Sequence, residues 1–237
     1  MNNFAGKNDC DMEITFDDVI VKAAPGLRVV KIEAEVSNSP TLPALRDEME
    51  QLMEEIQLKY ELGDINKRPG IAATRAAYKA LGKDPNRYRP SCDAMCRRIV
   101  KGMGLYYIDN LVDLINILSV KSGYSIGGFD MDKIDGERLT LGAGREGEPF
   151  EGIGRGALNI AHLPVYRDKT GGIGTPTSDN ERTKIDLTTR RLLICINIYG
   201  EEMATEETIA LAERLLHDYA DGRITSLEVI PARKQTP

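Results

Sequence analysis

The 237-residue sequence lacks several features that would assign it to a common functional class. It contains no run of about 18 apolar residues, which excludes a membrane-spanning helix. Its first residues, MNNFAGKNDCDMEITF, lack a basic start followed by an apolar block, so we expect no secretory signal. Four cysteines in a chain of this length do not make a disulfide framework. We therefore expect reduced thiols in a cytoplasmic protein (Cys10, Cys92, Cys96 and Cys195).

Motifs of well-known catalytic sites are also missing. The two histidines, His162 and His217, lie far apart in the sequence, and neither belongs to a nucleophile motif. There is no G-x-S-x-G, no P-loop and no dinucleotide fingerprint at a strand–helix junction. Cys92 and Cys96 are one helical turn apart, but the sequence has no second His or Cys pair that would complete a metal site. This favours ordinary thiols over metal ligands. The sequence supports neither a Ser-His-Asp hydrolase nor a zinc hydrolase, and we expect no cofactor.

Charge is distributed unevenly along the chain. The net charge is −6, yet residues 67–101 carry ten Lys or Arg against two Asp, which leaves −14 for the remainder. This asymmetry predicts a basic face on an acidic body, as in proteins that bind a polyanion, although an ordinary solvated helical surface explains a charge cluster equally well. Four cations on two predicted helices are candidates for phosphate contacts: Arg75 and Lys79, which are four residues apart, and Arg97 and Arg98.

Hydrophobic periodicity predicts an α+β protein. Helices are expected at 42–62, 69–82, 91–102, 108–122 and 204–220, and strands at 13–23, 27–36, 138–143, 163–168, 190–200 and 223–232. Helices cluster early and strands late, which favours α+β over a regular βαβ alternation. With no internal repeat and no linker, we expect a single domain over residues 1–237, with 1–12 as a flexible tail.

The helix predicted at 108–122 has an unusual polar edge. Its buried stripe consists of Leu111, Val112, Ile115 and Leu118, while Asp109, Asp113 and Asn116 follow another edge. For Asp109 we expect an exposed helix face. Asn116 lies near the buried edge between two isoleucines, so its amide needs partners, which either the backbone or a ligand can supply.

Glycines concentrate after this helix. Thirteen of the 22 fall within residues 123–174, interleaved with apolar residues, which favours tight turns and close backbone approaches. Gly127 and Gly128 permit contact with something bulky. They form either a bulge entering a strand at 129–134 or a set of exposed N–H groups that hold a carboxylate or ester oxygen.

A second glycine-rich loop spans residues 171–185. Ser178 and Glu181 fit a capping box, which predicts the start of a short helix there. A capped helix start that follows glycines also presents free N–H donors to an anion. The same loop is therefore a candidate binding site formed by Gly172, Thr177, Ser178, Asp179 and Arg182.

The segment NLVDLINILSVKSGYSIGGFDMDKIDG (110–136), followed by LTLGAGREGEPFEGIGRG, resembles the tRNA-editing domain of the bacterial phenylalanyl-tRNA synthetase beta subunit. YRPSCDAMCRRI and GTPTSDNERTKI resemble motifs of freestanding proteins built from that domain. The residues that fit the family pattern in register are Asn110, Val112, Asp113, Asn116, Gly123, Phe129, Asp130, Asp132, Lys133, Gly136, Gly147 and Glu148.

The resemblance implies a layered α+β domain with an unusual β-sandwich flanked by helices. It also implies hydrolysis of tyrosine wrongly attached to the phenylalanine tRNA. Three positions depart from the family: Ile115 replaces a Thr, Gly127 replaces the pocket His, and Ile194 aligns with a strand Glu. These departures remove the polar groups that would read a phenol hydroxyl. The aminoacylation domain of the synthetase is absent as well, so we do not expect the chain to charge tRNA.

Two functional hypotheses follow from the resemblance. In the first, the protein hydrolyses a misattached amino acid from aminoacylated tRNA, with Asn116 and Asp179 as catalytic candidates. The ester would lie between Gly127–Gly128 and residues 172–183, and the four basic residues Arg75, Lys79, Arg97 and Arg98 would contact tRNA. In the second, the chain is a non-catalytic module that binds tRNA or a free amino acid. A third interpretation, a small-molecule enzyme on the same scaffold, stays open because a fold does not determine a function. The sequence does not indicate an oligomeric state.

Overall fold

Two four-stranded sheets form the centre of the molecule, which we describe from a computed structural model for residues 11–233. The first sheet has the order β1 (Glu13–Phe16), β4 (Arg138–Ala143), β7 (Pro164–Arg167) and β8 (Gly172–Gly174). The second has the order β10 (Arg223–Pro231), β2 (Arg28–Glu35), β9 (Arg191–Ile198) and β3 (Ser125–Asp130). Neighbouring strands are antiparallel except for the parallel pair β1–β4. A short hairpin joins β5 (Glu151–Gly152) to β6 (Gly156–Ala157).

The two sheets pack face to face, because each buries one set of alternating apolar side chains. Ile14, Leu139 and Leu141 from the first sheet belong to the same buried cluster as Val29 and Leu193 from the second. The opposite face of the second sheet is also apolar, with residues such as Ile194 and Ile196 buried under helices. The second sheet is therefore covered on both faces, and this explains the continuous apolar run in β9.

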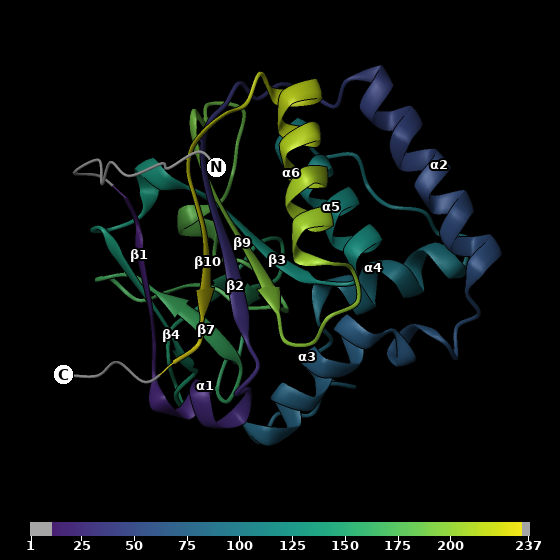
Figure 1. Ribbon diagram of the computed structural model, residues 1–237. Coiled ribbons are helices and arrows are strands. Elements are labelled where there is room, and N and C mark those ends of the chain that lie inside the picture. Colours follow the sequence, from purple (N-terminus) through teal and green to yellow (C-terminus); the bar gives the residue numbers. More distant parts are fainter. Residues whose placement is uncertain (1–10, 234–237) are drawn as a thin grey trace.

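Helices cover the second sheet on the side away from the first (Figure 1). The helices of residues 11–233 are α1 (Asp18–Ala23), α2 (Pro43–Lys59), α3 (Pro69–Ala80), α4 (Ser91–Val100), α5 (Asn110–Ser122) and α6 (Thr205–Ala220). Of these, α1 is not part of the covering layer, because its buried Ile20 belongs to the cluster between the two sheets. In Figure 1, α5 and α6 lie on this sheet, while α4 contacts both α5 and β3, and α2 lies outside α4 and α5. The predicted α+β class and the longer helices and strands are confirmed.

Helix α5 positions Gly127 and Gly128, which follow it in the chain. Asp109 accepts a hydrogen bond from the Val112 N–H at 2.9 Å and caps the first turn, while Gly123 ends the helix with φ 81°. The exposed helix face expected for Asp109 is wrong, because Asp109 is buried, as is Asp113. The carboxylate of Asp113 accepts from the Thr41 hydroxyl at 2.6 Å. These bonds fix the helix so that β3 begins immediately after it.

Three local predictions are wrong. Residues 18–23 form a helix rather than a continuation of β1, because only Ile20 finds a buried contact there and Asp18 and Lys22 complement the helix dipole. Ser91 is the first helical residue of α4 rather than its cap, since Pro90 takes that position. Gly127 and Gly128 lie inside β3, which ends at Asp130, so no strand runs over 129–134.

The predicted tail, residues 1–12, falls mainly outside the described residues. Within its described part, Met12 is buried and its N–H donates to Glu33 at 2.7 Å. Cys92, Cys96 and Cys195 are free, buried thiols, while Cys10 lies outside the described range. Over residues 11–233 no helix is both long and apolar enough to cross a membrane. The single-domain interpretation stays a prediction, and β2 and β10 from opposite ends of the chain are paired in one sheet.

Candidate functional site

The Gly127–Gly128 pair lies on β3, the outermost strand of its sheet. Across the free edge of β3, the Gly128 N–H donates to Asp179 Oδ2 at 3.4 Å. The two glycine-rich segments predicted to face each other are therefore adjacent. Their meeting point combines a glycine backbone with a carboxyl group.

Asp179 is the least compensated carboxyl group in this region. It has no ion pair among residues 11–233, and the long bond from Gly128 is the hydrogen bond that its side chain accepts. Burial among apolar groups raises the pKa of Asp179 to about 8, and the Gly128 N–H only partly opposes this shift. A carboxyl group with such a pKa can take up and release a proton near neutral pH.

Apolar side chains surround Gly128. A Cβ on this glycine would lie 2.5 Å from Cδ1 of Ile115 and 3.1 Å from Cδ1 of Ile185. On the other side, Gly128 pairs in register with Ile194 of β9. Both Ile115 and Ile194, the positions where the resembling family has Thr and Glu, thus lie next to this glycine.

Residues 175–180 form a turn rather than a capped helix start. The Thr175 hydroxyl accepts from the N–H groups of Thr177 and Ser178, at 3.1 and 3.0 Å. The capping-box prediction for Ser178 and Glu181 is wrong, because Asn180 caps the short 3-10 turn that follows. Compact Thr and Asn turns of this kind compete with helix formation.

This turn is attached to two helices. The Thr177 hydroxyl is 2.9 Å from the Tyr78 hydroxyl of α3, and the Pro176 carbonyl accepts from the Ser91 N–H at the start of α4. Asp179 is consequently held at a fixed place between β3 and these helices.

Two residues of the predicted binding loop lie elsewhere. Gly172 is buried in β8, where a Cβ would lie 3.0 Å from Phe150 and 3.2 Å from Val165. Arg182 donates two hydrogen bonds of 2.8 Å to the buried carboxylate of Asp168. A close packing position and a neutralised guanidinium explain both residues without a ligand.

Asn116 is half-buried on α5, next to the Ile115 that covers Gly128. Its side chain makes no hydrogen bond to any residue of the described chain. The backbone alternative considered for this amide therefore finds no support, and its hydrogen-bonding groups are available to solvent or a ligand.

Several cations of the 67–101 segment are structural. Arg75 is not part of an exposed face: it is buried at 9% exposure and donates to Asp93 at 2.7 Å. Arg68 is buried against Glu202 at 2.7 Å, and Lys83 donates to two backbone carbonyls. Spacing alone placed Arg75 beside Lys79, but the carboxylate of Asp93 draws it inward. Lys79 is exposed on α3.

Five cations of this segment line a groove along α4, namely Arg87, Arg89, Arg97, Arg98 and Lys101, whereas Lys67 and Lys79 do not. One hollow of about 330 Å³ is lined by Arg87, Tyr88, Arg89, Ala94, Arg155, Leu158 and Thr177. A second, of about 380 Å³, is lined by Leu62, Arg89, Ala94, Arg97, Arg98, Lys101 and Met103. Because Arg89 and Ala94 line both hollows, we treat them as one feature, the α4 groove. Thr177 at its end lies two residues from Asp179.

Aromatic rings accompany the cations of the α4 groove. Arg98 stacks over the exposed ring of Tyr106 at 4.1 Å, and Arg87 lies 5.6 Å from the centroid of the Tyr88 ring. Alternating cations and rings suit a nucleic acid strand, whose phosphates and bases they contact respectively. Arg89 and Arg155 had not been singled out. Arg155 is far from α4 in the sequence, and no local pattern connects it to the groove.

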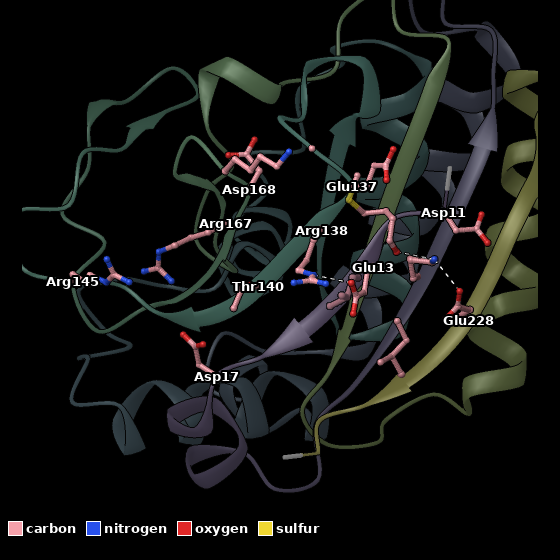
Figure 2. A pocket seen from close by; sticks show the side chains of 16 residues that line it. Asp11, Glu13, Asp17, Glu137, Arg138, Thr140, Arg145, Arg167, Asp168 and Glu228 are labelled. Atoms are coloured by element: carbon pink, nitrogen blue, oxygen red, sulfur yellow. Dashed lines mark hydrogen bonds and ion pairs between the residues drawn. The ribbon is translucent and has the colours of Figure 1, made fainter. Parts of the chain in front are cut away.

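A larger groove of about 1100 Å³ runs beside β1 (Figure 2). Strand β1 is an edge strand of the first sheet, whereas Gly127 and Gly128 lie on β3 of the second. Its charges are mostly paired: Arg138 contacts Glu13, and Lys31 contacts Glu228. None of these hollows is lined by Gly127, Gly128 or Asp179.

Comparisons with known proteins are consistent in the relatives that they name. Residues 73–217 match the family model of the B3/4 domain. The phenylalanine–tRNA ligase beta subunit of Bartonella henselae is 35% identical over 97 residues, which are 40% of this chain and 12% of that subunit. An N-terminal fragment of the phenylalanyl-tRNA synthetase beta subunit from Pyrococcus horikoshii aligns with 95% of this chain and 57% of its own, at 14% identity and a TM-score of 0.46. The matched region is thus a small part of the ligase subunit.

Proposed function

The chain belongs to the B3/4 domain family, and from this premise we propose that it binds aminoacylated tRNA and hydrolyses a misattached amino acid from it. One observation carries the proposal: Asp179, a carboxyl group without a cationic partner, lies at the free edge of β3 and two residues from the end of the α4 groove. A proton-transfer group is thus next to a surface that suits a nucleic acid.

The α4 groove is the proposed tRNA contact. Arg87, Arg89 and Lys101 are exposed, and none of them forms an ion pair among residues 11–233, so phosphates can replace water around them. Such contacts release counterions and contribute affinity without choosing a sequence. Arg97 and Arg98 belong to this groove, whereas Arg75 is excluded by its burial.

The proposed chemistry uses water as the nucleophile. Asp179, ionised, takes a proton from a water molecule whose oxygen attacks the ester carbonyl carbon. As the bond to the ribose oxygen breaks, Asp179 returns the proton to that oxygen. Free amino acid and uncharged tRNA result. The Gly128 N–H fixes the carboxylate, and the free amide of Asn116 orients the substrate or the water.

A deacylation assay across a panel of mischarged tRNAs tests this proposal. We expect at least one ester to be cleaved by wild-type protein at micromolar concentration, and Asp179→Asn to abolish the cleavage. Lys67→Gln provides a matched control, because Lys67 is an exposed cation paired with Asp64. If every tRNA in the panel stays charged, the hydrolase proposal is wrong.

A non-catalytic tRNA-binding module is the second candidate. It is favoured by Ile115, Gly127 and Ile194, which leave the site without the polar groups of the resembling family. Binding of charged tRNA without turnover would support it. Neutralising Arg89, Arg98 and Lys101 together should weaken binding in both cases and lower the salt slope by about one for each lost phosphate contact. Unchanged binding would remove the α4 groove from either function.

Under both candidates we propose that residues 1–237 act as one unit and that the protein works in the cytoplasm, where charged tRNA is found.

A further inference from the structure

The ring of Phe129 fills the space beside Gly127. A Cβ on Gly127 would lie 2.7 Å from Cζ of Phe129, and a Cβ on Gly174 would lie 2.5 Å from the same atom. The ring therefore fits between two glycines, one on each sheet. Any side chain at position 127 would have to displace it.

Asp179 lies at the edge of the same space. Its Oδ1 is 2.7 Å from the position that a Cβ on Gly174 would take, and 3.8 Å from the corresponding position on Gly127. The Phe129 ring and the Asp179 carboxyl thus share one small space.

The ring has little freedom to withdraw. Phe129 is fully buried and packs edge-to-face on Tyr166, with ring centroids 6.3 Å apart. Tyr166 is itself fixed by a hydrogen bond of 2.7 Å from its hydroxyl to Asn197. On the opposite face of β3, the space over Gly128 is filled by Ile115 and Ile185. Close-packed interiors of this kind resist the entry of additional carbon atoms.

We propose that Phe129, accommodated by Gly127 and Gly174, is a size filter that restricts the site to esters of amino acids with a hydrogen or methyl side chain. This inference rests on the proposed function, since it concerns the amino acid held beside Asp179. The ring of Phe129 offers no hydrogen-bonding group, so the accepted side chain is apolar as well as small.

The test compares one tRNA charged with glycine, alanine, phenylalanine or tyrosine. Wild-type protein should cleave the glycyl and alanyl esters at least tenfold faster than the aromatic esters, a discrimination within the range for added carbon atoms in an apolar site. Faster or equal cleavage of the aromatic esters would overturn the size filter and leave the hydrolase proposal standing.

Two variants separate size selection from a general loss of packing. Phe129→Ala opens the space, and Phe129→Leu shortens the side chain with less disturbance of the core. Both should raise the ratio of phenylalanyl to glycyl cleavage by at least tenfold. Phe16→Leu is the matched control, because Phe16 belongs to the same buried cluster but lies on β1. An equal change in the control would contradict a specific role for Phe129.

A binding measurement decides the question even without turnover. Adenosine that carries glycine or phenylalanine through a 3′ amide cannot be hydrolysed as an ester. Wild-type protein should bind the glycyl compound at least tenfold more tightly, and Phe129→Leu should reduce that difference. If the wild type binds both compounds equally, the size filter is wrong, whether or not the protein is a hydrolase.

Discussion

Asp93 and Asp179 are two carboxyl groups in opposite surroundings. Asp93 on α4 is fully buried between two guanidinium groups, Arg75 at 2.7 Å and Arg97 at 2.5 Å. Asp179 receives one long hydrogen bond and no cation among the described residues, and burial raises its pKa to about 8. The comparison separates a carboxylate that holds elements together from one that remains available for chemistry.

The cations of residues 67–101 fall into two groups in the same way. Arg75 neutralises Asp93, while Arg89 and Lys101 line the α4 groove and form no ion pair among residues 11–233. The ion pair of Asp93 joins α3 to α4, whereas a buried carboxyl group with a raised pKa and no cation among residues 11–233 is a candidate for a functional site.

The largest effect is expected for Asp179→Asn. Loss of a general base lowers rates by roughly 100- to 10,000-fold. We therefore expect the single-turnover rate of deacylation to fall at least about 100-fold, with tRNA affinity within about twofold of wild type. An unchanged rate would show that Asp179 is not the base and would remove the functional side of the comparison.

Asp93→Asn should affect stability instead. Removing one partner of a buried ion pair typically costs about 3–5 kcal/mol, because Arg75 would remain buried without a counter-charge. Urea-induced unfolding measures this loss, and Asp64→Asn, which removes an exposed carboxylate paired with Lys67, should leave the free energy of unfolding nearly unchanged. A loss of similar size in the control would contradict the structural role of Asp93.

Asp179 should make both stability and deacylation depend on pH. The pKa of Asp179 rises from 3.8 to about 8 on folding, so the folded state favours the protonated form and stability falls as pH increases through this range. In the same range deacylation should accelerate, since the ionised form is the base, and should level off above about pH 8. Asp179→Asn should remove this part of the pH dependence of unfolding. A flat rate profile between pH 6 and pH 9 would contradict the assignment.

A smaller effect is expected for Asn116→Ala. Loss of one hydrogen bond to substrate or water is worth about 1 kcal/mol, which corresponds to a rate reduction of about fivefold. The deacylation rate at saturating tRNA measures it. An identical rate in the variant would place Asn116 outside the site.

The sequence predicted the repeating parts of the fold well, because apolar periodicity is a local signal. The runs that became β9, α5 and α6 were recognisable from their own residues. It failed at residues 18–23, where β-branched side chains suggested a strand but only Ile20 finds a buried contact. Tertiary contact, which local pattern does not contain, decided that segment.

The site was predictable in part. The proximity of Gly128 to Asp179 followed from two glycine-rich segments and a resemblance to a known family. The burial of Arg75 was not predictable from the sequence. Helical spacing shows which residues share a face of α3, but it does not show that Asp93 of α4 lies opposite Arg75. The position of the Phe129 ring depends on Gly174 of the other sheet, and no local pattern in the sequence connects these residues.

The free edge of β3 has a consequence for solubility. An exposed outer strand is a template for pairing with another chain, and proteins usually protect such edges with charge, a bulge or a covering segment. Here the 175–180 turn covers β3, and Asp179 occupies one of its backbone donors. The segment proposed to perform chemistry therefore also prevents intermolecular strand pairing, and shortening it should promote aggregation as well as inactivate the protein.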